Sequence, residues 1–504
     1  MLLWITAPAC NYGGGTIRNC ILVAVLALGA FTSAFGDGPP QQWVAHYNSS
    51  GNGSELAADI AVDNLQNVYV TGSSYGGTAY YDDYATVKYD PNGSQLWVKR
   101  YNGPENGGDG ATCLAIDGSG NVCVAGYSYG GSSVTDYVTI KYSPDGTQLW
   151  AARYDGPGNS DDSASAIVID SSGNIYVTGT SFGGSSGTDY ATIKYSPDGN
   201  QLWVARYNSP ENSDEEAYGL AIDGSGNVYV TGVGYRQSTS ADYVTVKYDT
   251  NGNRLWTAVY NDADNGDDIV YALKVDNSGN AYVTGAGYSN NTDYDYVTIK
   301  YGPNGNQLWL ARYDGPQNGD DEAYDLVIDG SGNVYVTGYS YGGDTNYDYA
   351  TVKYDTNGNQ LWAARYNGPE NSDDYASALT LDVSGSAYVA GFCFGSSSSA
   401  DYVTVKYDRN GNQVWSARYN GTGNSEDYAT ALTVDNSGNV YVTGQSMGVG
   451  TSYDYATIKY VQRDYCTSPI PGDLNNDCKV DFRDIAILAS HWLDCSYALD
   501  EQCN

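Results

Sequence analysis

The sequence contains a unit that recurs eight times along most of its length. A tryptophan marks each copy, with a spacing of 54 residues between the first two copies and 53 residues thereafter. The tryptophans are Trp43, Trp97, Trp150, Trp203, Trp256, Trp309, Trp362 and Trp415. An aspartate recurs in step with them, at Asp63, Asp117, Asp170, Asp223, Asp276, Asp329, Asp382 and Asp435. Such a chain folds as an array of similar units rather than around one central core.

One copy, from Asp325 to Tyr366, contains four short segments that are rich in Val, Ile, Tyr, Thr and Trp. These residue types favour strands, and the clusters GSGN and DTNG supply the positive φ angles that tight hairpins need. The predicted strands are Asp325–Asp329, Val334–Gly338, Tyr349–Tyr354 and Gln360–Tyr366. Each unit is therefore a four-stranded antiparallel meander, and four strands in a period of this size are typical of a β-propeller blade.

The two ends of the repeat region are half-units that complement each other. Gln42–Tyr47 is a tryptophan strand with no partner before it, and Asp454–Tyr460 is a third strand with no tryptophan strand after it. We expect the N-terminal strand to complete the last blade. This pairing would close an all-β, eight-bladed propeller of four-stranded antiparallel blades over residues 42–460. An open solenoid is the alternative arrangement.

The composition restricts the class of partner. The chain has 59 acidic and 23 basic residues and a formal charge of −36. Nucleic acid is a poor partner, because phosphate contacts need clustered Lys and Arg. Most basic residues recur once per blade, in a lysine series that includes Lys88 and an arginine series that includes Arg100. We expect both series to form ion pairs with recurring aspartates.

Residues 1–36 do not belong to the repeat. Arg18 precedes the apolar segment Ile21–Phe31, and small residues follow up to Ala34 and Gly36. This pattern predicts a secretory signal peptide, with an apolar core too short to span a bilayer comfortably. We therefore expect a secreted or cell-surface protein that has no transmembrane segment after signal cleavage.

Each predicted blade has two long loops, which its strand order places on one rim. The loop before each first strand always contains an acidic residue at one site, and the second loop is rich in Gly, Ser and Tyr. A ring of carboxylates beside a central channel could bind divalent cations, basic peptides or sugar hydroxyls, with tyrosine as contact surface. Alternatively, each acid caps its own loop by accepting backbone N–H hydrogen bonds, which its recurrence in every blade favours. The candidate rim residues are Glu55, Asp109, Asp162, Glu215, Asp268, Asp321, Asp374 and Asp427.

The same symmetry argues against catalysis. An enzyme needs one constellation of unlike groups with different pKa values, whereas the blades repeat the same residues. The two histidines, His46 and His491, have no sequence neighbours that indicate a triad or a metal cluster. We predict no catalytic residue.

The pattern ALxxDxSGNVYVTG…DYxTxKYxxxGxxLWxxxY, as in Ala378–Tyr419, resembles the bacterial SBBP-type β-propeller repeat and, more loosely, NHL repeats. The resemblance covers residues 42–460 and implies the propeller fold. The family name refers to seven blades, whereas this chain has eight copies of the pattern. Its members share no single activity that the resemblance would imply here.

After the propeller we predict a linker, residues 461–471, and a small module, residues 472–504. Five oxygen-bearing side chains stand at positions 1, 3, 5, 9 and 12 of a 12-residue loop, with a backbone carbonyl at position 7. This is the spacing of an EF-hand calcium loop, and an amphipathic helix, Phe482–Leu493, follows it. The predicted calcium ligands are Asp473, Asn475, Asp477, Lys479, Asp481 and Asp484.

This module resembles a single, cysteine-bearing dockerin type I repeat of the kind attached to bacterial exported proteins. The resemblance implies calcium as a cofactor and a cohesin-like or cell-surface protein as a partner. Cys478 replaces the usual loop glycine, and cohesin-binding dockerins have two copies instead of one. In an oxidising compartment, a module of this size is a natural place for disulfides. The candidate cysteines, whose pairing stays open, are Cys466, Cys478, Cys495 and Cys503.

Together these features predict an exported, non-enzymatic recognition or scaffolding propeller. Its loop-bearing rim would bind a glycan or protein ligand, and its calcium-binding tail would tether it to a partner or surface. An enzyme or accessory subunit of extracellular polysaccharide degradation is the first alternative, because dockerin-type tails accompany such hydrolases. A structural cell-envelope protein is the second. Cys113, Cys123 and Cys393 are expected to be small buried hydrophobes.

Overall fold

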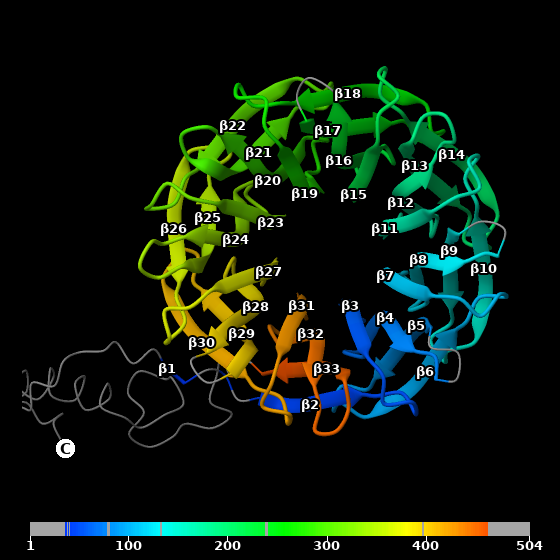
Figure 1. Ribbon diagram of the computed structural model, residues 1–504, viewed down its shortest axis with the longest axis horizontal. Helices are drawn as coiled ribbons and strands as arrows, with labels where there is room; N and C mark the ends of the chain where they lie inside the picture. Colours follow the sequence, from blue (N-terminus) through cyan, green and yellow to red (C-terminus); the bar gives the residue numbers. More distant parts are fainter. Residues whose placement is uncertain are drawn as a thin grey trace, which may run out of the picture. The chain divides into compact units, whose positions relative to one another are not determined.

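The computed structural model describes residues 36–37, 39, 41–77, 81–131, 134–236, 240–395 and 398–461. Within this part of the chain the regular structure consists of strands, which form a closed ring of eight antiparallel blades (Figure 1). No helix among the described residues has the length and apolar character needed to cross a membrane. The predicted calcium module and nearly all of the predicted signal peptide lie outside the described residues.

We number the blades 1 to 8 in chain order. Each blade has four strands, which follow one another from the centre of the ring to its outer edge. The inner strands are β3 (Glu55–Val62), β7 (Asp109–Ile116), β11 (Asp162–Ile169), β15 (Glu215–Ile222), β19 (Asp268–Val275), β23 (Asp321–Ile328), β27 (Asp374–Leu381) and β31 (Asp427–Val434). The second strands are β4 (Val68–Tyr75), β8 (Val122–Tyr129), β12 (Ile175–Phe182), β16 (Val228–Arg236), β20 (Ala281–Ser289), β24 (Val334–Tyr341), β28 (Ala387–Gly395) and β32 (Val440–Met447).

The third and outer strands complete each blade. The third strands are β5 (Asp82–Tyr89), β9 (Thr135–Tyr142), β13 (Thr188–Tyr195), β17 (Ser240–Tyr248), β21 (Asp293–Tyr301), β25 (Tyr347–Tyr354), β29 (Ser398–Tyr407) and β33 (Tyr453–Tyr460). The outer strands are β6 (Gln95–Tyr101), β10 (Gln148–Tyr154), β14 (Gln201–Tyr207), β18 (Arg254–Tyr260), β22 (Gln307–Tyr313), β26 (Gln360–Tyr366), β30 (Gln413–Tyr419) and, for blade 8, β2 (Gln41–Tyr47).

The ring closes where the first long strand of the described residues pairs with the last. Strand β2 runs antiparallel to β33, with Val44 opposite Ile458 and Ala45 opposite Thr457. The predicted closure is confirmed, and an open solenoid is excluded. A short strand, β1 (Gly36–Asp37), pairs in parallel with β30 and adds a fifth strand to blade 7. Gly36, the last residue of the predicted signal peptide, is therefore part of a strand.

Apolar cores lie between neighbouring blades. In one of them, Tyr176 and Ala205 of blade 3 pack with Ala217, Leu220 and Val228 of blade 4. A single blade is too thin to bury both of its faces, so each blade is stabilised by the two beside it.

Hydrogen bonds from the recurring tryptophans join neighbouring blades, and we call each such bond a tryptophan latch. Trp150 Nε1 of blade 2 donates a hydrogen bond of 3.0 Å to the carbonyl of Pro197, in the turn between the third and outer strands of blade 3. Lys141 Nζ donates to the same carbonyl at 3.3 Å. The same latch crosses the closure, because Trp43 Nε1 donates to Pro91 O at 3.0 Å. Seven of these bonds join the blades in series, from blade 8 through blade 1 to blade 7.

Candidate functional site

The eight acids predicted on the rim each begin an inner strand instead of lying in a loop. All eight are 0 % exposed. In blade 6, Asp321 Oδ2 accepts the backbone N–H of Gly315 at 2.6 Å, and Oδ1 accepts that of Tyr341 at 3.0 Å. The carboxylate thus holds both long loops against the blade, in agreement with the loop-capping interpretation. None of the eight presents an exposed oxygen to a ligand.

Each of these acids starts a polar row that crosses the blade. Asp321 lies opposite Ser340 on the second strand, which lies opposite Asp348 on the third strand. From the outer strand, Arg365 Nη2 bonds to Asp348 Oδ2 at 2.8 Å and reaches the backbone carbonyl of Ser340 at 2.8 Å. The predicted pairing of blade arginines with recurring aspartates is confirmed here and in the sister pairs. Burial raises the pKa of Asp321 to about 7.

Blade 8 departs from this row because β2 has a histidine where most outer strands have the arginine. His46 Nε2 lies 3.1 Å from the hydroxyl of Tyr419, and the charge of Asp454 acts on it. Burial lowers the pKa of His46, and Asp454 opposes that change. This histidine therefore replaces a permanent charge with a neutral ring at the closure.

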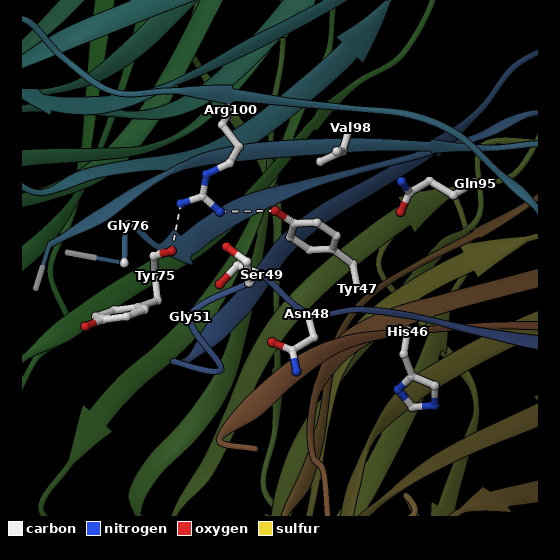
Figure 2. A pocket seen from close by; sticks show the side chains of 12 residues that line it. His46, Tyr47, Asn48, Ser49, Gly51, Tyr75, Gly76, Gln95, Val98 and Arg100 are labelled. Carbon is white, nitrogen blue, oxygen red and sulfur yellow. Dashed lines mark hydrogen bonds between the residues drawn. The ribbon is translucent and has the colours of Figure 1, made fainter. Parts of the chain in front are cut away.

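A hollow of about 390 Å³ lies beside this closure, with His46, Tyr47 and Arg100 in its lining. Figure 2 shows the Arg100 guanidinium directed at Tyr47 and Tyr75. It donates to the Tyr47 hydroxyl at 3.1 Å and to the Tyr75 carbonyl at 2.8 Å. Much of the remaining lining is short polar residues and glycine of the loops, including Asn48, Ser49 and Gly51 (Figure 2). Among its polar groups, the bond from Arg100 to Tyr47 joins blade 1 to blade 8.

Two groups of three carboxylates in the described part of the chain are close enough to share a cation. Their ligand oxygens lie within 4.8 Å of one another, in the sets Asp136, Asp155, Asp162 and Asp295, Asp314, Asp321. Each set already has a cation beside it, because Arg153 bonds to Asp136 and Arg312 bonds to Asp295 at 3.0 Å. The arginines therefore supply positive charge at these places.

Another hollow breaks the eightfold pattern and is the candidate site. It has a volume of about 490 Å³ and lies over the starts of inner strands β19, β23 and β27. We call it the aromatic pocket, and its lining residues are Tyr271, Tyr324, Tyr375, Ala376, Ser377 and Phe392. The four rings in this lining are half-buried. A pocket of this size and lining is typical of a ligand site.

Ring contacts continue from the pocket across blades 5 to 8. Ring centroids are 4.9 Å apart for Tyr271 and Tyr324, and 5.3 Å apart for Tyr375 and Phe392. Tyr339 joins the two pairs, at 5.7 Å from Tyr324 and 5.0 Å from Tyr375. The contacts then run on from Phe392 to the last blade through Tyr428 and Tyr453. The rings support one another, so the pocket wall is held in place.

Tyr271 and Tyr324 enter the site at one repeated position, the fourth residue of the inner strand, whereas Tyr375 is the second residue of its strand. At the fourth residue every inner strand has a register shift, so its side chain is outside the regular ladder. Three consecutive blades have tyrosine there, namely Tyr218, Tyr271 and Tyr324. The other five blades have Ala58, Thr112, Ser165, Ser377 and Thr430. The substitution of small residues by tyrosine on one side of the ring makes that side aromatic.

A carboxylate is held beside this wall by two of its tyrosines. Glu322 Oε2 accepts hydrogen bonds from the hydroxyls of Tyr271 and Tyr324, both at 3.2 Å. Burial, followed by the charge of Glu322, raises the pKa of both tyrosines, so they remain neutral donors. Burial raises the pKa of Tyr375 to about 12, with Asp373 and Glu322 adding to the effect. The pocket therefore combines π faces with negative charge.

The structure places the remaining predicted residues as follows. Cys113, Cys123 and Cys393 are free, buried thiols, as predicted. The calcium loop from Asp473 to Asp484 and the four tail cysteines lie outside the described residues. The aromatic pocket was missed from the sequence, although tyrosine in one repeat column of three consecutive copies is a signal that could have found it.

Comparison with known proteins agrees with the fold. A family model described as a β-propeller repeat, SBBP, matches four segments that together cover less than half of the chain. Each begins within an outer strand and continues into the next blade. The segments are residues 149–190, 202–235, 311–344 and 414–449.

One relative is the uncharacterized WD repeat-containing protein L264 of Acanthamoeba polyphaga mimivirus, which is 24% identical over 353 residues. The match covers 59% of this chain and 22% of the relative, so the chain spans about a fifth of that protein.

Two solved structures are similar at low identity. A eukaryotic initiation factor has a TM-score of 0.43 and 10% identity, covering 81% of this chain and 90% of that chain. Drosophila Plexin A, in complex with Semaphorin 1b, has a TM-score of 0.43 and 9% identity, covering 84% and 88%. The closed ring of repeated blades makes the chain a β-propeller, and four of its segments are similar to the β-propeller repeat model.

Proposed function

We propose that this protein is a non-enzymatic recognition disc that binds its ligand in the aromatic pocket. The observation that supports this most is the departure from eightfold symmetry. The buried acids and tryptophan latches recur from blade to blade and hold the ring together, whereas the pocket occupies one arc, blades 5 to 7. A feature that the repeat does not need for folding is the part of the ring best suited to a specific ligand.

The chemistry of the pocket supports binding rather than catalysis. Its lining offers four aromatic rings, a methyl group and the hydroxyl of Ser377. The nearby carboxylate, Glu322, is engaged by two tyrosine hydroxyls. Acid–base catalysis needs two unlike titratable groups directed at one point, with their pKa values pushed apart. Six of the eight strongly buried acids instead accept hydrogen bonds from backbone N–H groups, and Glu55 accepts them from serine hydroxyls.

The proposal extends to the two ends of the chain on sequence grounds. The N-terminal pattern supports export, so that the disc would act outside the cell. The oxygen spacing from Asp473 to Asp484 supports one calcium ion in the tail, which would tether the disc to a cohesin-like or cell-surface partner.

The recognition role is tested by offering the full chain a panel of glycans and peptides and measuring both binding and the release of reducing ends. We expect binding without release, and loss of binding in Tyr324→Ser. Serine is the residue that blades 3 and 7 have at this position, so the repeat tolerates it. Turnover of a glycan that Glu322→Gln abolishes would overturn the non-enzymatic proposal.

The calcium proposal has its own test in isothermal titration calorimetry. Calcium should bind the full chain at a tail site that is lost when Asp473→Ala and Asp484→Ala are combined, because both ends of the ligand loop are then removed. Asp145→Ala, in an exposed propeller turn, is the matched control and should keep the site. Unchanged binding in the tail variant would contradict the loop assignment.

A further inference from the structure

We propose that the occupant of the aromatic pocket is a basic side chain, lysine or arginine, presented by a polypeptide partner. This inference rests on the proposed function and specifies its ligand. It follows from three observations, namely the geometry of the rings, the fixed carboxylate among them, and the charge of the surrounding blades.

The rings of the pocket offer their flat faces to a cation. Tyr271, Tyr324, Tyr375 and Phe392 enclose about 490 Å³, which accommodates a long side chain and part of its backbone. Cations are attracted to aromatic faces by the ring quadrupole, and more strongly where water is excluded. The protein uses this contact internally in most blades. Lys353 Nζ lies 4.5 Å from the centroid of Tyr335, and Lys247 Nζ lies 4.6 Å from that of Tyr229.

The carboxylate of Glu322 is positioned to complete the charge pair. The hydroxyls of Tyr271 and Tyr324 both bond to Oε2, which fixes the carboxylate beside the rings. An ammonium or guanidinium group that enters the pocket would contact π faces and a fixed anion together. Such a charge-assisted hydrogen bond is stronger than one between neutral groups.

Further acids surround the site. Asp320 accepts from the Tyr347 hydroxyl at 3.4 Å, and Asp373 acts on the pKa of Tyr375. The pocket lining contains no lysine or arginine. With a formal charge of −36 on the whole chain, long-range attraction favours basic partners and repels acidic ones. A neutral sugar would gain nothing from this field, although it would stack on the same rings.

The test is fluorescence anisotropy with the full chain at physiological salt and three labelled probes of matched length, namely hexalysine, hexaglutamine and cellohexaose. We expect hexalysine to bind and the neutral probes to bind at least tenfold more weakly. Tyr324→Ser should weaken hexalysine binding about tenfold, through loss of a ring and of one donor to Glu322. Glu322→Gln should weaken it about fivefold and reduce its salt dependence.

Blade 4 supplies matched controls. Tyr218 and Glu216 occupy the same repeat positions as Tyr324 and Glu322 and are bonded to each other at 2.6 Å, but they are outside the pocket lining. Tyr218→Ser and Glu216→Gln should leave hexalysine binding unchanged, which separates a pocket effect from general charge attraction. Equal loss in the blade 4 variants, or no loss in the blade 6 variants, would overturn the basic-ligand proposal. Cellohexaose binding that depends on Tyr324, without hexalysine binding, would also overturn it while leaving the recognition role in place.

Discussion

At the scale of single residues, the blades are organised by buried polar groups that bond to one another and to the backbone inside the sheet. Asp348 is 3 % exposed and is held by Arg365, while Asp321 is held by backbone N–H groups. Burying a carboxylate is costly unless hydrogen bonds or a counter-charge compensate. The sequence predicted the arginine–aspartate pairs from their shared period. It could not show that the rim acids are buried, because burial depends on how two loops fold over the strand end.

These buried acids make the stability of the ring depend on pH. Burial raises the pKa of Asp321 from 3.8 to about 7 and that of Asp268 from 3.8 to about 7. The folded state therefore holds these protons more tightly than the unfolded chain, and stabilisation from this source is complete below pH 3.8. It is lost as the pH rises through about 7. The midpoint temperature of thermal unfolding should therefore decrease as the pH is raised from about 5 to about 8.

Differential scanning calorimetry of Asp321→Asn should show a smaller pH dependence over the same interval, because one such group no longer titrates. Asp145→Asn is the control. Hydrogen bonds from Ser143 and Thr147 lower the pKa of Asp145, so it titrates below this interval and its variant should keep the wild-type slope. If the unfolding temperature of Asp321→Asn changes with pH as steeply as that of the wild type, the contribution assigned to the raised pKa of Asp321 is contradicted.

At the scale of the strands, sequence reasoning located every blade but misplaced the start of the inner strand. The predicted first strand of blade 6 begins at Asp325, whereas β23 begins at Asp321. The register shift between Ala323 and Asp325 explains the difference. A bulge interrupts the alternation of buried and exposed residues on which strand prediction depends. The same bulge frees the fourth residue to line the pocket.

The turn that receives each tryptophan is a second feature at this scale. Gly199 has a φ of 84°, and a Cβ there would lie 2.6 Å from the ring of Trp150 on the preceding blade. Gly199→Ala should therefore lower the free energy of unfolding by about 2 kcal/mol, from backbone strain and displacement of the indole. Urea unfolding followed by tryptophan fluorescence measures this change.

Gly118→Ala is the matched control for this substitution. A Cβ at Gly118 would meet nothing within 4 Å, and its φ lies outside the left-handed region. Alanine there should leave stability unchanged or raise it by a few tenths of a kcal/mol, because it restricts the unfolded chain. Equal effects of the two alanines would show that the tryptophan latch does not contribute to stability.

At the scale of the whole molecule, closure depends on one strand pairing between distant parts of the chain. Removal of residues 41–47 would leave β33 as an unpaired edge and would remove the latch from Trp43 to Pro91. We expect this variant to unfold at a markedly lower temperature and to self-associate through the exposed edge. Thermal unfolding and analytical ultracentrifugation measure the two effects.

A peptide of sequence QQWVAHY, added in trans, should restore part of the lost thermal stability by pairing with β33. A peptide with the same residues in scrambled order is the control, because it has the composition without the register of Trp43 opposite Lys459. Wild-type stability of the deletion variant without any peptide would contradict the role of β2 in closure.

The sequence by itself determined the number of blades, their four-stranded character and the completion of the last blade by the first strand. It could do so because these properties are encoded locally and then repeated, so that eight copies report the same pattern. The tertiary structure alone decided which differences between the copies come together in one pocket. Tyr324 of blade 6 and Tyr375 of blade 7 become parts of one pocket only because the curvature of the ring brings adjacent inner strands together at its centre. That convergence is a property of packed blades and has no counterpart within any single repeat.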